Sequence, residues 1–236
     1  MKKTALITGA GRRIGKAIAL KLAGQGYSIA LHYHTSKNQA QALCREIQLF
    51  GVRCIPFKCD LSRENQVRNL IPNIVRKMPD LEVVINNASF FERRTFLETE
   101  IDDFSKVFNI NFKAPFFICR DFARTCRKGH IINILDTKIS SCQSAYFVYT
   151  LSKKILASFT EMAAKTLGPQ IRVNSIAPGL ILPPAGENDK YMNIMAKKLP
   201  LRRKGNVSNI TDTIEGLLNN DFITGQCIFV DGGQRL

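Results

Sequence analysis

Apolar runs alternate with segments of helical period from one end of the chain to the other. Short apolar runs bounded by turn residues predict strands at residues 4–8, 27–34, 52–59, 81–85, 130–135, 172–176 and 227–230. Apolar positions three or four apart predict helices at residues 14–24, 37–50, 64–77, 101–126, 146–167 and 207–218. Strands that alternate with helices of this length are typical of parallel sheets with right-handed crossovers. We therefore expect one doubly wound α/β domain spanning residues 1–236.

Composition and charge narrow the class of protein. The chain has 236 residues, of which 45% are hydrophobic and 22% charged, which suits one domain with a full core and excludes a disordered chain. Its net charge is +15, but the basic residues are spread along the chain, with only short clusters such as Arg202-Arg203-Lys204. Nucleic-acid-binding proteins concentrate such residues. We expect no nucleic-acid partner, and the reason for the high charge stays open.

The spacing of the cysteines and the lack of long apolar runs indicate in which cellular compartment the protein resides. Seven cysteines are scattered with no CxxC pair, which is typical of buried thiols in a reducing cytosol. No apolar run approaches the roughly 18 residues of a membrane span, and no signal-peptide core follows Met1. The sequence predicts a cytoplasmic protein without a membrane partner.

A glycine-rich turn lies where the first strand becomes the first helix. Backbone N–H groups and the helix dipole bind a pyrophosphate at such a place. A nucleotide-triphosphate loop is unlikely, because Gly11 and Gly15 have three intervening residues and Ala17 follows Lys16. The candidate cofactor contacts of this turn are Thr8, Gly9, Arg12, Arg13, Ile14 and Gly15.

The end of the second predicted strand indicates which dinucleotide binds. A carboxylate there usually holds the ribose hydroxyls of NAD. This chain instead has His32, Tyr33, His34, Thr35 and Ser36, with no carboxylate before Glu46. Hydroxyls, imidazoles and a nearby Arg12 or Arg13 suit a 2′-phosphate, so NADPH is expected rather than NADH. The two histidines lack an evident third ligand, so we predict no metal site.

Tyr149 and Lys153 form the candidate proton-transfer pair. They lie four residues apart in a predicted helix and so share one face. An ammonium beside the phenol favours the phenolate and lowers the tyrosine pKa toward a useful range. Such a pair also occurs by chance on amphipathic helices. Its position downstream of a dinucleotide turn favours the catalytic interpretation.

Several motifs occur in the order found in one enzyme family. Thr8-Gly9 with Gly15, Asn86-Asn87-Ala88-Ser89, Asn111, Tyr149-x-x-x-Lys153, Pro178-Gly179 and Val230-Asp231-Gly232-Gly233 together resemble the short-chain dehydrogenases/reductases. The resemblance implies a Rossmann-type, seven-stranded parallel sheet, a nicotinamide cofactor and a homotetramer. It implies Asn111, Tyr149 and Lys153 as catalytic residues, with Asn111 holding a water and Lys153 also binding the nicotinamide ribose. It adds Asp60, Leu61, Asn87, Ala88, Ser89, Pro178, Gly179 and Leu180 as cofactor contacts.

Two departures from that family pattern indicate a branch. Asp136 stands thirteen residues before Tyr149, where the family usually has serine, and Arg13 replaces a glycine of the phosphate turn. With residues 32–34 and 87–91, these resemble the pteridine reductases and the bacterial dihydromonapterin reductases. In that branch an arginine that helps to hold the 2′-phosphate commonly stands at the position of Thr35, so the strength of the predicted NADPH selection stays open.

The aspartate suits a different acceptor from the usual serine. A serine hydroxyl stabilises a developing oxyanion, which an ionised carboxylate would repel. A pterin offers a C=N nitrogen that must gain a proton and N–H donors that a carboxylate accepts. Asp136 is therefore expected either to be protonated or to orient the phenol. Beyond Asp136 and Tyr149, the resemblance to pteridine reductases implies Arg13, Ser89 and Phe91 as substrate contacts. A polar, proline-containing segment at about residues 180–200 is predicted to form a lid, with Tyr191 as a further contact.

These observations favour an NADPH-dependent reductase that converts a dihydropterin to the tetrahydropterin by reducing its C=N bond. The choice among dihydromonapterin, dihydrobiopterin and dihydrofolate stays open. A carbonyl reductase of the same fold, such as a 3-oxoacyl-(acyl-carrier-protein) reductase, is the first alternative. A non-catalytic dinucleotide-binding sensor or scaffold is the second.

Overall fold

A seven-stranded parallel sheet forms the centre of the molecule. The computed structural model describes residues 3–142, 145–184 and 189–236. The strands are β1 (Thr4–Ile7), β2 (Ser28–Tyr33), β3 (Cys54–Lys58), β4 (Leu81–Asn86), β5 (Gly129–Ile134), β6 (Ile171–Pro178) and β7 (Cys227–Val230). Their order is β3-β2-β1-β4-β5-β6-β7, and every pairing is parallel. The predicted doubly wound α/β fold is confirmed.

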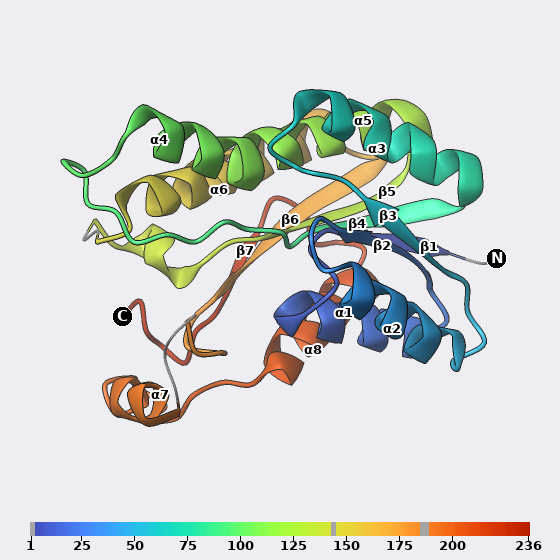
Figure 1. Cartoon of the computed structure of the whole chain (residues 1–236). Helices are drawn as coiled ribbons and strands as arrows, with labels where there is room; N and C mark the ends of the chain where they lie inside the picture. Colours follow the sequence, from blue (N-terminus) through green and yellow to red (C-terminus); the bar gives the residue numbers. More distant parts are fainter. Residues whose placement is uncertain (1–2, 143–144, 185–188) are drawn as a thin grey trace.

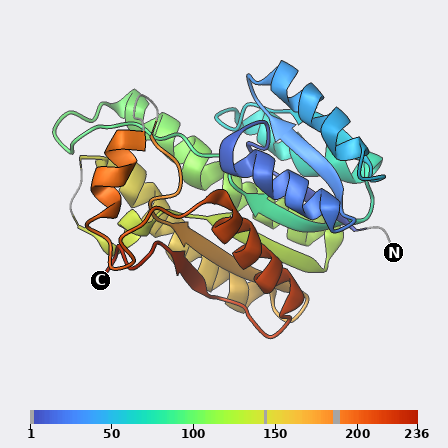
Figure 2. The ribbon, with the colours of Figure 1, turned by 90° about the horizontal axis from the view of Figure 1, so that it is seen from below.

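Helices cover both faces of this sheet (Figure 1). On one face lie α1 (Arg13–Gly24), α2 (Lys37–Gln48) and α8 (Val207–Asn219), which Figure 2 shows from below. The other face carries α3 (Glu64–Lys77), α4 (Ile101–Phe108), α5 (Ala114–Cys126) and α6 (Phe147–Leu167). The chain order of strands and helices places the crossing point between β1 and β4, where the strand order reverses and ligands of such sheets bind.

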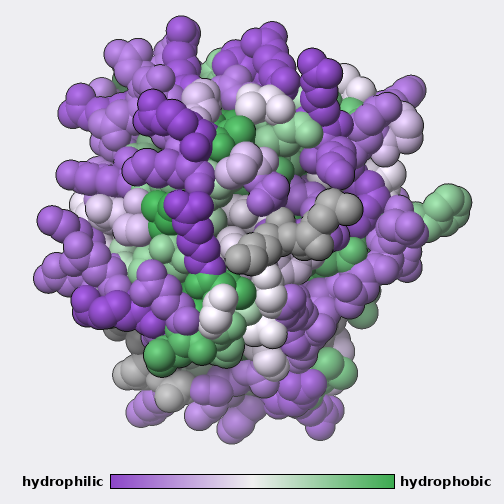
Figure 3. All heavy atoms as spheres, turned by 90° about the vertical axis from the view of Figure 1, so that its right-hand side faces the viewer, coloured by the Kyte–Doolittle hydropathy of each residue, from purple (hydrophilic) through white to green (hydrophobic). Residues whose placement is uncertain are grey.

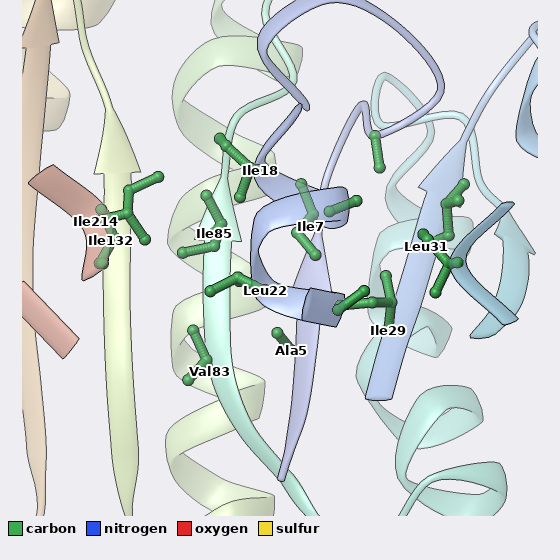
Figure 4. Packing of buried hydrophobic residues seen from close by; sticks show 14 of the residues in the cluster. Ala5, Ile7, Ile18, Leu22, Ile29, Leu31, Val83, Ile85, Ile132 and Ile214 are labelled. Atoms are coloured by element: carbon green, nitrogen blue, oxygen red, sulfur yellow. The ribbon is translucent and has the colours of Figure 1, made fainter. Parts of the chain in front are cut away.

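The packing beneath α1 fixes the first strands against each other. Ile18 and Leu22 are four residues apart on one helix face and are fully buried. They lie over Ile7, Ile29 and Ile85, which come from three adjacent strands (Figure 4). Burying a side chain of this size contributes roughly 1.5–3 kcal/mol, so this cluster holds the start of α1 firmly over the strand ends.

The opposite face of the sheet has its own core. Leu6, Val84 and Ile131 alternate with the residues of the first core along their strands, as the two-residue period of a strand requires. They pack against Ile71 of α3 and Phe122 of α5, both fully buried. Strands that are apolar on both faces are expected when helices cover both faces.

The predicted helix at residues 101–126 is interrupted. A π-helical segment, η1 (Asn109–Lys113), separates α4 from α5. Apolar periodicity cannot distinguish one extra residue in a turn from a regular helix, so the sequence predicted a single element. Such π-helical turns occur frequently at functional sites.

The segment predicted as a lid contains a helix that the periodicity did not indicate. This helix, α7 (Asp189–Ala196), lies away from the sheet below α6 in Figure 1. Residues 185–188 of the predicted lid lie outside the described residues. The lid itself stays a prediction.

The predicted site residues lie at only one end of the sheet. Figure 3 shows the face on the side of the chain's N-terminus, and hydrophilic side chains dominate it. The carboxyl ends of the parallel strands lie at the other end, where the predicted site residues gather. Within the described ranges, no helix is long and apolar enough to cross a membrane.

Candidate active site

A cavity of about 1250 Å³ opens at the carboxyl ends of the strands. It extends from the turn after β1 past the ends of β2, β4, β5 and β6 to α6 and α7. Every predicted site residue lines it except Thr8 and Asn111. Its volume exceeds the roughly 300–1000 Å³ of a site for one drug-sized ligand, so it has room for a dinucleotide and a second molecule.

The turn after β1 has the backbone that a pyrophosphate needs. A Cβ on Gly15 would lie 2.3 Å from the Gly9 carbonyl oxygen, and one on Gly11 would lie 2.6 Å from Ser36 Oγ. The first turn of α1 has no acidic residue, and no side chain caps its N-terminus. Its free N–H groups and helix dipole therefore suit an anionic phosphate group. Arg13 adopts φ +54° in this turn, a region that favours glycine.

Thr8 and Asn87 join the phosphate turn to the end of β4. Thr8 Oγ1 accepts the backbone N–H groups of Asn87 and Ala88, both at 2.9 Å. The Asn87 side-chain amide donates to the Thr8 carbonyl at 2.8 Å. Thr8 is buried and is not among the residues that line the cavity. Its observed contacts position the turn, and the predicted contact of Thr8 with the cofactor stays a prediction.

The ring of His32 is hydrogen-bonded to backbone groups on both sides. Its Nδ1 accepts the Gly9 N–H at 2.9 Å, so the hydrogen is on Nε2, which donates to the Cys59 carbonyl at 3.0 Å. Burial lowers the pKa of His32 to about 4, which keeps the ring neutral. Both ring nitrogens are thus engaged, and the predicted hydrogen bond from this ring to a 2′-phosphate does not fit the geometry.

At the end of the cavity where the adenosine of a dinucleotide is expected, the charged side chains are either paired with one another or exposed at the rim. His34 Nε2 lies 3.6 Å from Asp60 Oδ2. Burial opposes ionisation of Asp60, but hydrogen bonds from the backbone and hydroxyl of Ser62 hold its pKa below the usual value. Arg12 and Arg13 are exposed at the rim. In the part of the chain that the structure describes, no three His, Cys, Asp or Glu side chains are placed to hold a metal ion.

Asp136 and Tyr149 are directly hydrogen-bonded. The Tyr149 hydroxyl donates to Asp136 Oδ2 at 2.9 Å, and the phenol is buried. Burial and then the neighbouring carboxylate raise the pKa of Tyr149 well above its usual value, while a hydrogen bond with Ser89 lowers it in part. The sequence predicted a lowered pKa from Lys153. That expectation is wrong, because the carboxylate and the burial both favour the protonated phenol.

Lys153 lies beneath the phenol without a hydrogen bond to it. Its Nζ donates to the Ile134 carbonyl at 2.8 Å and lies 5.9 Å from the centre of the Tyr149 ring. The side chain is only 2% exposed, and burial lowers its pKa to about 8. Because it lines the cavity, it remains placed to contact a bound ribose.

Asn111 holds the cavity wall together. Its Nδ2 donates to the Phe90 carbonyl at 2.9 Å and to Ser152 Oγ at 3.1 Å. Its Oδ1 accepts the Phe90 N–H at 2.7 Å and the Ser89 hydroxyl at 3.3 Å. All four hydrogen-bonding positions of this buried amide are therefore used by the protein. The side chain therefore positions residues 89 and 90 from the π-helix η1, and the predicted role of Asn111 in holding a water stays a prediction.

Aromatic rings line the substrate half of the cavity. Phe91 stacks on Tyr146 with ring centres 4.5 Å apart and meets the Tyr149 ring edge-on at 4.7 Å. The predicted substrate contact Tyr191 reaches the cavity from α7. Arg13 extends across the opening and donates to the Pro183 carbonyl at 2.7 Å, which links the phosphate turn to the segment predicted as a lid.

Sequence reasoning missed several cavity residues, of which Tyr146 and Lys138 lie near Asp136 and Phe91. Tyr146 lies three residues before Tyr149, so the helix spacing could have indicated it. Lys138 follows Asp136 by two residues in the short 3-10 helix η2 (Thr137–Ser140), and nothing in the sequence pattern indicates its place.

Comparison with known proteins covers almost the whole chain. Residues 9–235 match the family described as Enoyl-(Acyl carrier protein) reductase. The 3-oxoacyl-(acyl-carrier-protein) reductase FabG of Staphylococcus epidermidis is 30% identical over 244 residues, covering 100% of both chains. The crystal structure of FolM alternative dihydrofolate reductase 1 from Brucella suis in complex with NADP superposes with a TM-score of 0.94 at 31% identity, covering 99% of this chain and 95% of that one.

A further solved structure extends the range of named activities. Acetoin dehydrogenase YohF from Salmonella typhimurium has a TM-score of 0.90 at 28% identity and covers 99% of this chain and 96% of its own. Both solved structures superpose on this chain over almost its whole length and so share its fold. The family match over residues 9–235, the full-length relatives and the motif order together lead to one conclusion. The chain belongs to the short-chain dehydrogenase/reductase family of nicotinamide-dependent oxidoreductases.

Proposed function

We propose that this protein is an NADPH-dependent reductase of the C=N bond of a dihydropterin. The single observation that carries the proposal is the 2.9 Å hydrogen bond from Tyr149 to Asp136, at the position where the family pattern has a serine. NADPH supplies the hydride when it is bound. The likeness to a structure named FolM alternative dihydrofolate reductase 1 supports this assignment.

The protein's own part is to supply a proton to the ring nitrogen. Reduction of C=N adds a hydride to the carbon and a proton to the nitrogen. The Tyr149 phenol carries its proton at neutral pH, and its raised pKa keeps the phenolate scarce, so it is placed as a donor in the reductive direction. Asp136 holds the hydroxyl in a fixed orientation, and its carboxylate also accepts hydrogen bonds from N–H groups of a pterin. Phe91 and Tyr146 provide aromatic surface for a flat ring.

The proposed preference for NADPH over NADH is based on the side chains at the rim of the adenosine end of the cavity. Arg12 and Arg13 are exposed there, and the hydroxyls of Thr35 and Ser36 line the same wall. Asp60 is the acidic residue of this region, and His34 and Arg63 lie within 3.6 Å of its carboxylate. The balance of charge therefore favours a 2′-phosphate over a free hydroxyl.

A carbonyl reductase is the second candidate function. Its support is the 30% identity to FabG and the likeness to an acetoin dehydrogenase. For a ketone, the hydroxyl of Tyr149 would protonate an oxygen beside the carboxylate of Asp136. The repulsion between this carboxylate and the developing oxyanion lowers the expected rate.

Self-association and a cytoplasmic location complete the proposal. Phe104, Phe116 and Met162 expose apolar surface on α4, α5 and α6, which supports assembly of copies into the homotetramer that the family resemblance implies. All seven cysteines are free thiols, which suits a reducing compartment. Analytical ultracentrifugation tests the assembly.

A panel of substrates tests the function. NADPH oxidation is followed at one enzyme concentration with dihydromonapterin, dihydrobiopterin, dihydrofolate, an acetoacetyl thioester and acetoin, and the products are identified by mass spectrometry. The proposal predicts a tetrahydropterin product and a kcat/KM at least tenfold higher for one dihydropterin than for either ketone. Faster ketone turnover contradicts it, and NADPH binding without any turnover favours a non-catalytic sensor.

A further inference from the structure

A lysine lies on the far side of the Asp136 carboxylate from Tyr149. Asp136 Oδ2 accepts the phenol hydrogen bond, while Oδ1 accepts the backbone N–H of Lys138 at 2.8 Å. The Nζ of Lys138 lies 3.9 Å from the same Oδ1. The carboxylate thus carries a phenol on one oxygen and a cation near the other.

Aromatic rings hold this ammonium group in place. Lys138 Nζ lies 5.5 Å from the centre of the Tyr146 ring and 5.8 Å from that of Phe91. Both distances fall within the range of a cation–π contact. The Lys138 side chain is 35% exposed, so water screens its charge only in part. It lines the cavity together with Asp136 and Tyr149.

The expected partner of the phenol is less suited to supply this charge. Lys153 gives a hydrogen bond to the Ile134 carbonyl, and its lowered pKa of about 8 means that it loses its charge as the pH rises through that value. Among the described residues, the other side chains that contact Tyr149 are neutral. These are the Ser89 hydroxyl and the Phe91 ring, on which Tyr146 stacks in turn. Behind η2, Asp231 is engaged by the Thr137 hydroxyl at 2.7 Å.

We propose that Lys138 is a positioning residue that sets how tightly the Asp136–Tyr149 pair holds its proton. This inference rests on the proposed function in that the pair supplies the proton of the reduction. The ammonium favours the ionised carboxylate, so it lowers the proton affinity of the pair as a whole. Two coupled acids titrate together, so the effect belongs to the pair.

Three variants separate this role from a structural one. Lys138→Met removes the charge and keeps the aliphatic chain, and Lys138→Arg keeps the charge. Lys154→Met is the matched control, because this lysine lies on α6 outside the cavity lining. The pH dependence of kcat/KM is measured for the best substrate of the panel, whether pterin or ketone.

Without the ammonium, the pair binds its proton more tightly. The alkaline midpoint of activity should therefore move upward by roughly 0.5–1 pH unit in Lys138→Met, since the charges are about 4 Å apart and partly screened. Lys138→Arg should restore the wild-type midpoint, and Lys154→Met should not change it. Equal midpoints in wild type and Lys138→Met, or equal shifts in Lys138→Met and Lys154→Met, would overturn the proposal.

A second readout does not depend on turnover. In cofactor-free protein labelled with ¹³Cζ-tyrosine, Tyr149→Phe assigns the Tyr149 resonance, and this resonance is followed on acidification. Its midpoint should be higher in Lys138→Met than in wild type and unchanged in Lys138→Arg. If no pterin is reduced but this shift occurs, the proposed function fails while the inference stands. If pterins are reduced but neither midpoint moves, the inference fails alone.

Discussion

At the scale of single residues, the central feature of the site is the buried hydroxyl proton of Tyr149. Burial and the Asp136 carboxylate both destabilise the phenolate and so raise the pKa of Tyr149. Lys153, which the sequence placed in the role of activator, instead donates to the Ile134 carbonyl and has a lowered pKa. The residue types of the pair were predictable from their spacing. The direction of the pKa shift was not, because it depends on burial and on a carboxylate thirteen residues away.

Removing the phenol hydroxyl tests its role as proton donor. Tyr149→Phe should lower kcat by about 10²–10⁴-fold, the range expected for loss of a general acid. NADPH affinity, measured by fluorescence titration, should change less than threefold, since the phosphate turn is untouched. Wild-type turnover in this variant would rule out the proposed role.

The buried ammonium of Lys153 predicts a pH dependence of stability. Its pKa is lowered from 10.5 to about 8, so the unfolded state binds the proton more tightly between these values. The contribution of this group is therefore complete above pH 10.5 and is lost as the pH falls through 8, with a size of about 3 kcal/mol.

Urea unfolding of wild type and Lys153→Met at pH 7 and pH 10 measures this contribution. The wild type should gain stability relative to Lys153→Met on going to pH 10, because the buried charge is then lost. Titration of the remaining groups is common to both proteins and cancels. A stability difference that is independent of pH would contradict the account.

At the scale of elements, the sequence predicted most of the scaffold. The seven strands follow from short apolar runs, and the helices follow from their period. The π-helix η1 could not be predicted, because one extra residue per turn leaves the apolar pattern of residues 101–126 almost intact. That segment nevertheless places Asn111, whose amide fixes residues 89 and 90 at the cavity wall. Helix α7 was missed because its residues lie in a polar, proline-containing segment.

The phosphate turn offers a test at this scale. Gly15→Ala should destabilise the protein by about 1–3 kcal/mol, since the new Cβ would lie 2.3 Å from the Gly9 carbonyl oxygen. It should also weaken NADPH binding at least tenfold because the turn must shift. Gly216→Ala in α8 is the matched control, because its Cβ would meet nothing within 4 Å.

Thermal unfolding and NADPH titration of both variants give the answer. The control should gain about 0.5–1 kcal/mol, as expected for alanine in a helix. A Gly15→Ala protein with wild-type NADPH affinity would show that close approach in this turn is unimportant.

At the scale of the whole molecule, two buried imidazoles join neighbouring strands of the sheet or the turns that follow them. His32 joins the phosphate turn to the end of β3, and His130 of β5 contacts Asn174 of β6. Burial lowers their pKa values to about 4 and about 3. Their contribution to stability is complete above pH 6.5 and is lost as the pH falls toward these values.

Acid should therefore unfold the protein. Guanidinium midpoints are expected to decrease between pH 6.5 and 4, with a loss on the order of 3 kcal/mol from His32 alone. His32→Gln can still accept and donate a hydrogen bond but does not titrate, so its acid loss should be smaller than that of wild type. His34→Gln, at an exposed position, is the control. Equal acid loss in His32→Gln and wild type would contradict the assignment.

The central claim is that the Asp136 carboxylate adapts this family's site to a nitrogen heterocycle. The most direct measurement is the ratio of kcat/KM for the best dihydropterin to that for acetoacetyl thioester, in wild type and in Asp136→Ser. We predict that the ratio falls at least 100-fold in Asp136→Ser, through loss of pterin turnover with ketone turnover kept or raised. An unchanged ratio, with pterin turnover retained, would contradict the account.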